Sequence, residues 1–232
     1  MKKIIAICLL LIVAACSSKK EGNMIVQGKI KGLKKGTLYL QKMQDTVLVS
    51  IDSVALLGKE DFILTDNVEE PILYYLTFDG NTTDKRILFF AEKGIITIND
   101  DVEKFGLSPE ITGSKNQEVL DNYYKIARQF NGQRLDLIKE SFEAQKEQNE
   151  EKQTEITKKS ENLIKRRYLY TTNYVLTHPD FEAAPYIALT ELSNATIKLL
   201  DTINVTLTDR VKTTTYGKRF VEFVSKVKET EQ

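Results

Sequence analysis

Residues 110–130, EITGSKNQEVLDNYYKIARQF, contain the point at which the apolar pattern of the chain changes. Ser114 and Gln117, three residues apart, have the spacing of a capping box, which marks the first turn of a helix. Beyond them, apolar residues recur every three or four positions, as on one face of a helix. These residues are Leu120, Tyr123, Tyr124, Ala127 and Phe130. The pattern predicts a boundary after Gly113 and a helical region over 114–232.

The residues before this boundary alternate between apolar and polar with a period of two. In GTLYLQK, for example, Leu38 and Leu40 fall on one face and Tyr39 on the other. This is the pattern of a β-strand with one buried face, and turn signals such as EKG at 92–94 separate the runs. Residues 24–113 therefore predict an antiparallel β-sandwich or barrel-like sheet, so the whole chain predicts an α+β fold.

Two of the expected strands are apolar on both faces. In PILYYLTFD (71–79), Leu73 and Tyr75 are as large and apolar as the residues that alternate with them, and RILFFAE (86–92) shows the same pattern. A strand that is apolar on both faces needs cover on both sides. We expect two central strands, each with one face in the sandwich core and the other under the helical region or a partner.

The helical region begins with two long helices that meet at a polar stretch, residues 143–162. A helical hairpin with a solvated tip explains this stretch, because its polar middle projects into water while its apolar ends pack near the sheet. Further helices are predicted over 184–200 and 205–228. Thr206 and Asp209 have capping-box spacing for the last of them.

The first residues of the chain have the pattern of a secretory signal. Lys2 and Lys3 precede the apolar run Ile4–Val13, which is too short to span a bilayer as a helix. Val-Ala-Ala then precedes Cys16, which resembles the lipobox of bacterial lipoproteins, where the thiol takes a diacylglyceryl group and the signal is cut before it. The alternatives are an uncleaved anchor or an ordinary signal peptide with an incidental cysteine.

This pattern predicts a location. We expect residues 1–15 to be the signal peptide, Cys16 the lipid attachment site and residues 16–23 a flexible tether. Acyl chains would hold the protein on a membrane of the bacterial cell envelope. Ser17 follows the cysteine where an aspartate would retain a lipoprotein at the inner membrane, so the resemblance implies the outer membrane and leaves its face open.

The composition of the expected mature chain excludes several functions. Its 217 residues contain 31 basic and 33 acidic side chains, which provide no electrostatic basis for binding nucleic acid. Cys8 is removed with the signal and Cys16 is acylated, so no free thiol, disulfide or redox pair remains. We expect no thiol-redox activity, and stability that comes from packing.

Five phrases, in their order and spacing, resemble a domain of unknown function common in Bacteroidetes-type lipoproteins. They are VQGKIKGLKKGTLYLQK, SIDSVALLGKEDFIL, EPILYYLTF, FFAEKGIITI and ITGSKNQ. The resemblance covers about residues 25–227. In that family, the β-rich region and its helices usually precede a thioredoxin-like domain related to thiol-disulfide oxidoreductases and peroxiredoxin-like proteins.

The end of the sequence departs from that family. TTTYGKRFVEFV (213–224) resembles the helix that leads into the thioredoxin-like domain, and the sequence then ends at Gln232. We therefore expect only the accessory part of the family here, without its oxidoreductase activity.

No catalytic, metal or cofactor constellation is found in the sequence. His178, the only histidine, lies in LTHPDF, where a helix-capping or loop role is expected. NDDVE at 99–103 lacks the glycine and spaced carboxylates of a calcium loop and indicates the turn after a strand. The abundant Asp and Glu leave a glycosidase-like pair open, but no spacing selects one.

Three tripeptides resemble the Asp-Ser/Thr-aliphatic acceptor of O-glycosylation in Bacteroidetes-type envelopes. Their acceptor residues are Thr46, Ser53 and Thr202. Such tripeptides also arise by chance, and an intact mass of the mature protein from its native host tests the modification.

The sequence supports two main functional hypotheses. The first is a non-enzymatic, lipid-anchored binding or accessory module for an envelope protein or small ligand, with a thioredoxin-like lipoprotein acting in trans as the specific partner. The second is an envelope hydrolase that acts on glycans or peptides through dispersed Asp and Glu carboxylates. A third, a structural surface protein with the polar tip as a spacer, also stays open.

Overall fold

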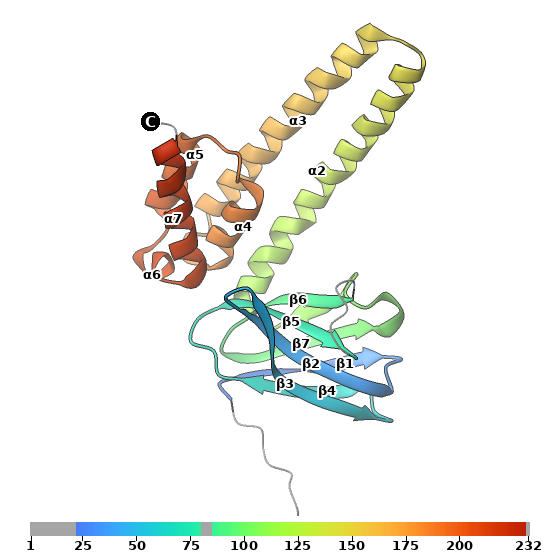
Figure 1. Cartoon of the computed structure of the whole chain (residues 1–232), viewed down its shortest axis with the longest axis vertical. Coiled ribbons are helices and arrows are strands. Elements are labelled where there is room, and N and C mark those ends of the chain that lie inside the picture. Colours follow the sequence, from blue (N-terminus) through green and yellow to red (C-terminus); the bar gives the residue numbers. More distant parts are fainter. Residues whose placement is uncertain (1–21, 80–84, 231–232) are drawn as a thin grey trace, which may run out of the picture.

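The computed structural model describes residues 22–79 and 85–230. Two four-stranded sheets form the N-terminal part and α-helices form the rest (Figure 1). The α+β prediction is confirmed. Cys16 lies outside the described residues, as do the signal peptide and most of the tether.

The two sheets pack as a sandwich; one contains the first and the last strands of the β-rich region, and the other contains β2, β3, β5 and β6. One sheet has the order β4-β1-β7-β8 and the other β3-β2-β5-β6. The strands are β1 (Met24–Lys31), β2 (Lys35–Gln44), β3 (Val47–Leu57), β4 (Asp61–Asp66), β5 (Ile72–Phe78), β6 (Arg86–Ala91), β7 (Gly94–Asp101) and β8 (Glu110–Thr112). A short 3₁₀ turn, η1 (Val102–Lys104), precedes β8.

Strand β1 pairs in parallel with β7, whereas the other pairs in both sheets are antiparallel. Met24 lies opposite Gly94, and the register continues to Lys31 opposite Asp101. The alternation of side chains has the same period in parallel and antiparallel strands. The sequence pattern therefore predicted where these strands lie in the sequence, but it could not indicate that β1 and β7 pair in parallel.

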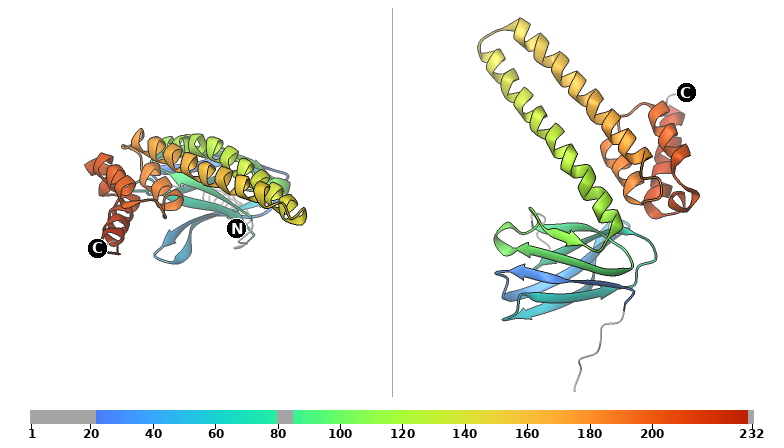
Figure 2. Two further views of the ribbon diagram at one scale, coloured as in Figure 1. Left: turned by 90° about the horizontal axis from the view of Figure 1, so that it is seen from above. Right: turned by 180° about the vertical axis from the view of Figure 1, so that it is seen from behind.

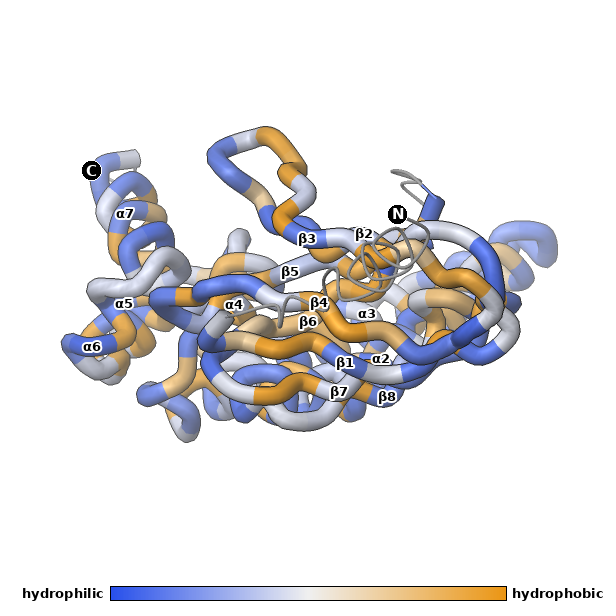
Figure 3. Tube along the Cα trace, turned by 90° about the horizontal axis from the view of Figure 1, so that it is seen from below, coloured by the Kyte–Doolittle hydropathy of each residue, from blue (hydrophilic) through white to orange (hydrophobic). Residues whose placement is uncertain are grey.

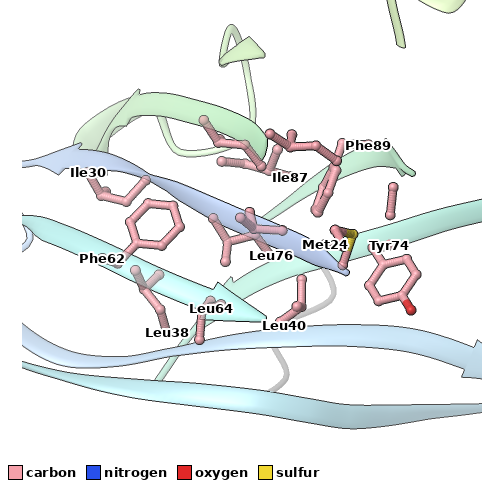
Figure 4. Packing of buried hydrophobic residues seen from close by; sticks show 14 of the residues in the cluster. Met24, Ile30, Leu38, Leu40, Phe62, Leu64, Tyr74, Leu76, Ile87 and Phe89 are labelled. Atoms are coloured by element: carbon pink, nitrogen blue, oxygen red, sulfur yellow. The ribbon is translucent and has the colours of Figure 1, made fainter. Parts of the chain in front are cut away.

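The sandwich core consists of side chains at alternate positions of both sheets. Leu40, Leu64, Leu76 and Phe89 are fully buried, and Figure 4 shows them converging between the sheets. Burying a side chain of this size stabilises the fold by about 1.5–3 kcal/mol. The predicted faces of GTLYLQK are confirmed, because Leu38 and Leu40 both lie in this core.

The two strands that are apolar on both faces occupy different positions in the sheet. β5 lies between β2 and β6, as predicted for a central strand, but β6 forms the edge, so its central placement was wrong. The expected cover is present over Phe90 and Leu73, whereas Leu88 of β6 stays 37% exposed. Phe90 of β6 is fully buried and Leu73 of β5 partly buried, both within the hydrophobic core of the helical region.

The helical region contains a long hairpin and four shorter helices. The hairpin consists of α2 (Lys115–Lys146) and α3 (Glu150–Leu176), which run antiparallel away from the sandwich (Figure 2). The shorter helices are α4 (Ala183–Glu191), α5 (Ile197–Thr206), α6 (Asp209–Lys212) and α7 (Thr215–Thr230). None of the helices in the described part of the chain has the length and apolar character of a membrane span.

Helix α2 begins where the sequence predicted. The Ser114 hydroxyl accepts a hydrogen bond from the Gln117 amide at 3.1 Å, which satisfies one of the free donors of the first turn. The reciprocal half of a capping box is missing, because the Gln117 side chain bonds elsewhere. Gly113 has φ +93°, and a Cβ there would lie 2.0 Å from the Ile95 carbonyl oxygen, so only glycine fits.

The C-terminal helices differ from the prediction in number. Four helices replace the two expected over 184–200 and 205–228, because the chain breaks at Leu192–Thr196, at Leu207–Thr208 and at Thr213–Thr214. The capping box at Thr206 and Asp209 was wrong. Thr206 ends α5 and donates its hydroxyl hydrogen to the Thr202 carbonyl oxygen at 2.8 Å.

The tip of the hairpin is polar and exposed, as the sequence predicted. Asn149 caps α3 by accepting a hydrogen bond from the Lys152 amide at 2.9 Å. Between the two helices, Ala144 and Ile156 are buried, whereas Gln153 donates to the Ser141 carbonyl oxygen. The interface between α2 and α3 near the tip is therefore narrow and partly polar.

Candidate functional site

A buried polar joint fixes the start of α2 to the end of β6. The Glu92 carboxylate accepts hydrogen bonds from the Lys115 amide at 2.6 Å and from the Asn116 side-chain amide at 3.0 Å. A carboxylate near the first amides of a helix also complements the helix dipole. Gln117 adds a bond from the Phe90 amide to its side-chain oxygen at 2.9 Å. Two phrases of the sequence, FFAEKG and SKNQ, therefore meet in space.

The same joint extends to α4 and α6. The Asn116 side chain, 3% exposed, donates to Glu182 at 3.0 Å and accepts from the Ala183 amide at 2.9 Å. Glu182 is almost fully buried and forms an ion pair with Arg210. A buried carboxylate needs such partners, so these residues serve the packing of the helical region.

A second joint fixes α7 to β5. The Glu70 carboxylate accepts hydrogen bonds from the amide of Thr215, at 3.1 Å, and from its hydroxyl. The Leu73 amide donates to the Tyr216 hydroxyl at 3.2 Å. Since both ends of the helical region are attached to the β5–β6 edge, the helices and the sandwich present one continuous surface there.

Aromatic rings form the layer beneath that surface. Phe90 makes edge-to-face contacts with Tyr186 and Tyr216, with ring centroids 5.7 Å apart in both cases. Such contacts add about 0.5–1.5 kcal/mol each to the burial of the rings. Burial raises the pKa of Tyr216 to about 12 and also raises that of Tyr124.

A cleft of about 680 Å³ lies between β6, the loop before β8 and α2. We call it the junction cleft. Its apolar lining includes Leu107 and Leu88, which are 78% and 37% exposed. Its polar lining is Arg86, Ser108, Gln117, Asp121, Tyr124 and Arg128. Exposed apolar side chains beside convergent polar groups are typical of a binding site.

The charges of the junction cleft favour an anionic group. Its lining contains two guanidinium groups, of Arg86 and Arg128, and one carboxylate, of Asp121. Arg86 lies over the Tyr75 ring, with 5.1 Å between the guanidinium carbon and the ring centroid. Burial raises the pKa of Asp121, while a hydrogen bond from Gln117 and the charge of Arg128 oppose that shift. A guanidinium group can bind a carboxylate or phosphate with two parallel hydrogen bonds.

A second hollow, beside β1 and β7, contains more carboxylates but uses them for local structure. Glu60 pairs with Lys29 at 3.0 Å, and a hydrogen bond from the Gly32 amide together with Lys29 lowers its pKa. Asp100 accepts a hydrogen bond from the Gly106 amide at 2.7 Å. Asp101, in the predicted NDDVE turn, caps η1 through the Glu103 amide. The prediction of a turn over 99–103 was only partly right, because Asn99, Asp100 and Asp101 end β7 and only Val102 and Glu103 lie in the turn that follows.

The remaining residues that the sequence singled out lie apart from the junction cleft. His178 stacks on Tyr174 at the end of α3, with one ring nitrogen 2.8 Å from the Tyr174 carbonyl oxygen, which agrees with the expected capping role. No group of three His, Cys, Asp or Glu side chains suited to a metal ion occurs within 22–79 and 85–230.

The three candidate O-glycosylation residues are all at the surface. Thr46 lies in the exposed turn between β2 and β3, strands that project from the sandwich (Figure 3). Ser53 is exposed on β3. Thr202 is exposed on α5 and donates its hydroxyl hydrogen to the Lys198 carbonyl oxygen at 2.8 Å. Their modification stays a prediction.

Sequence reasoning did not find the junction cleft, because its residues come from three separate segments. Tyr124 was assigned to the apolar stripe, although Arg128, one turn further on, lies on the same face of α2. The sequence signal that could have indicated this face was Arg128, one helical turn after the aromatic Tyr124. Arg86 and Leu107 carried no signal, since only the pairing of β6 and the loop before β8 bring them to α2.

Residues 24–120 match the sequence profile of DUF4369, a domain of unknown function. The matched span covers all eight strands of the described residues and ends at Leu120. It therefore includes both residues of the Glu92–Asn116 joint. No curated protein and no solved structure matches this chain. The profile therefore includes the part of the junction cleft formed by β6, the loop before β8 and the first turns of α2, whereas Asp121, Tyr124 and Arg128 lie beyond it.

Proposed function

We propose that this chain is a non-catalytic accessory protein of the bacterial cell envelope that binds a partner through the junction cleft. One observation carries the proposal: Leu88 and Leu107 stay exposed beside Arg86 and Arg128 in a cleft of about 680 Å³. Exposed apolar groups next to guanidinium groups suit a partner with an acidic group on an apolar surface.

The location is part of the same proposal. A lipid on Cys16 would hold the protein on the outer membrane, and the pattern of the first 16 residues supports this. The tether of residues 16–23 leads directly to β1, which begins at Met24. Eight extended residues reach at most about 28 Å, so the sandwich would stay within that distance of the membrane surface.

The partner to test first is a thioredoxin-like envelope protein that acts in trans. The resemblance of the sequence supports this choice, since in that family the β-rich region and its helices precede a thioredoxin-like domain. In this proposal the junction cleft contributes binding, and the partner contributes any thiol chemistry.

Site-specific crosslinking in the native host tests the binding proposal. A photoreactive residue in place of Leu107 is expected to crosslink a thioredoxin-like envelope protein, whereas one at Lys198, exposed on α5, is not. Arg128→Glu is expected to weaken binding of the identified partner at least tenfold. Lys125→Glu, on the same helix but outside the cleft lining, is the matched control. Equal crosslinking at both positions would contradict the proposal.

Metabolic labelling with a fatty acid tests the anchor. The wild-type protein is expected to incorporate the label and the Cys16→Ser variant is not. An unlabelled wild-type protein would remove the lipid anchor from the proposal without affecting the junction cleft.

The raised pKa of Asp121 favours envelope hydrolysis as a second candidate function. Burial raises the pKa of Asp121 and so favours its protonated form, the form that a general acid needs. Such enzymes place a second carboxylate about 5–10 Å away, and Asp121 is the one carboxylate in the cleft lining given by the described residues. Asp121→Asn distinguishes the two functions: a hydrolase would lose turnover of envelope glycans or peptides, whereas a binding module would retain partner affinity.

A further inference from the structure

The face of α2 that lines the junction cleft continues beyond it toward the hairpin tip. Tyr124 and Arg128 are followed, at alternating steps of three and four residues, by Asn131, Leu135, Ile138 and Phe142. Residues at this spacing lie on one side of a helix. The cleft and the distal half of α2 therefore share one continuous face.

Three large apolar side chains on this face are exposed. Leu135, Ile138 and Phe142 are 63%, 39% and 61% exposed, and we call them the α2 ridge. They do not belong to the interior of the hairpin, where Ala144 and Leu163 are buried. Single exposed apolar residues are common, but three in a row on one helix face indicate a contact surface.

Basic side chains line both sides of the ridge. Lys139 and Lys146 lie one turn after Leu135 and Phe142 on one flank, and Arg134 lies one turn before Ile138 on the other. Asp136 and Glu140 line a hollow between α2 and α3, whereas Glu143 lies on the same flank as Lys139 and Lys146. Arg134, Lys139 and Lys146 outnumber this one carboxylate, so the two flanks of the ridge carry a net positive charge.

We infer that the α2 ridge docks an acidic amphipathic helix, contributed by the partner that the junction cleft binds. This inference rests on the proposed function and extends its contact surface along α2. From Tyr124 to Phe142 the face is about 27 Å long, which matches five turns of a partner helix. Helices bind such faces through apolar anchors three or four residues apart, and acidic flanks would meet Arg134, Lys139 and Lys146.

Charge argues against a second copy of the chain as the occupant. A symmetric dimer would place the same ridge on both subunits, and its basic flanks would then face each other. Like charges at an interface cost stability, whereas an acidic helix neutralises them.

A designed peptide tests the inference directly on the full mature chain. The probe is an 18-residue helical peptide with leucines three and four residues apart and glutamates on both flanks. The comparison peptide has the same leucines and lysine flanks. We expect the glutamate peptide to bind and the lysine peptide to bind at least tenfold more weakly, measured by fluorescence anisotropy. Equal affinity for both peptides, or no binding of either, would overturn the inference.

Variants locate the binding on the ridge. Leu135→Ser/Phe142→Ser and Lys139→Glu/Lys146→Glu are each expected to weaken the glutamate peptide at least tenfold. The matched controls are on α3: Ile164→Ser/Leu169→Ser, at exposed apolar residues, and Lys158→Glu/Lys165→Glu, with the same seven-residue spacing. Unchanged helicity and melting temperature confirm folding. An equal loss in ridge and control variants would refute the location, as would a wild-type dimer that Leu135→Ser/Phe142→Ser dissociates.

Crosslinking from two positions separates this inference from the proposed function. Photoreactive residues at Leu107, in the cleft, and at Ile138, on the ridge, are both expected to crosslink the same partner. A crosslink at Leu107 without one at Ile138 would overturn the ridge and leave the cleft function intact. Crosslinks at neither position would overturn both.

Discussion

The base and the distal half of α2 use the same spacing of apolar residues in opposite surroundings. At the base, Leu120 and Tyr123 are buried and Asn116 is bound to Glu92 and Glu182. In the distal half, Leu135 and Phe142 are more than half exposed. The comparison shows that an amphipathic pattern marks a contact surface without specifying whether the contact is inside the protein or with another molecule.

Replacing one phenylalanine in each region with alanine gives the largest expected difference in unfolding free energy. Phe90 is fully buried against the helices, so Phe90→Ala should lower the unfolding free energy of the protein by about 3–5 kcal/mol. Phe142→Ala should change it by less than about 0.5 kcal/mol, because that side chain is 61% exposed. Urea denaturation of the two variants measures both values. A loss at Phe142 close to that at Phe90 would mean that the ridge is covered within the protein.

Removing the central amide of the joint should have the next largest effect. Asn116→Ala leaves the Ala183 amide and part of Glu182 without partners, which should cost about 1–3 kcal/mol. Asn122→Ala, at an exposed position of the same helix, is the control and should be neutral. Thermal denaturation compares the pair. A neutral Asn116→Ala would show that the joint does not hold the helices on the sandwich.

Removing the two helix caps of the hairpin should lower stability over different parts of the molecule. Ser114→Ala, at the base, should lower global stability by about 1 kcal/mol. Asn149→Ala, at the tip, should instead accelerate amide exchange over the adjacent turns, because that end contacts only the facing helix. Hydrogen exchange followed by mass spectrometry resolves the two patterns. Global destabilisation by Asn149→Ala would contradict the comparison.

The smallest expected effect is a pH dependence of opposite sign at two aspartates. Burial raises the pKa of Asp121, so its ionised form costs stability at neutral pH and Asp121→Asn should be slightly stabilising there. That gain should shrink as the pH falls through the folded-state pKa. Urea denaturation at pH 7 and pH 4 measures it.

Asp66 in the sandwich is the counterpart. Burial opposes its ionisation, but hydrogen bonds from Lys42, at 2.7 Å, and from Tyr74 lower its pKa overall. Asp66→Asn should therefore be destabilising at neutral pH, and its deficit should shrink as the pH falls toward the folded-state pKa. The same sign for both variants would contradict the assignment of these two environments.

Local patterns predicted the elements of this fold but not their partners. Alternation at Leu38 and Leu40 located a strand, and Ser114 located the start of α2. The edge position of β6 and the parallel pairing of β1 with β7 depend on contacts between distant segments. The break between α4 and α5 also escaped prediction, because it contains no glycine or proline and its Ala195 is buried like a residue of the apolar stripe.

The junction cleft was beyond prediction for the same reason. Arg86, Leu107 and Arg128 come from a strand, a loop and a helix that carry no shared spacing. The Glu92–Asn116 bond could have been suspected, since both residues lie in phrases that resembled one family, but neither phrase indicates the other as its partner.

The narrow hairpin gives the molecule a mechanical property. Its two helices are supported beyond the sandwich only by each other over their distal turns, and α2 alone is about 48 Å long. A load at the tip would act on a long lever, and the base of α2 would resist it through the hydrogen bonds of Asn116 and the packing of Leu120 and Tyr123. A small tilt of this lever would change the width of the gap between α2 and β6.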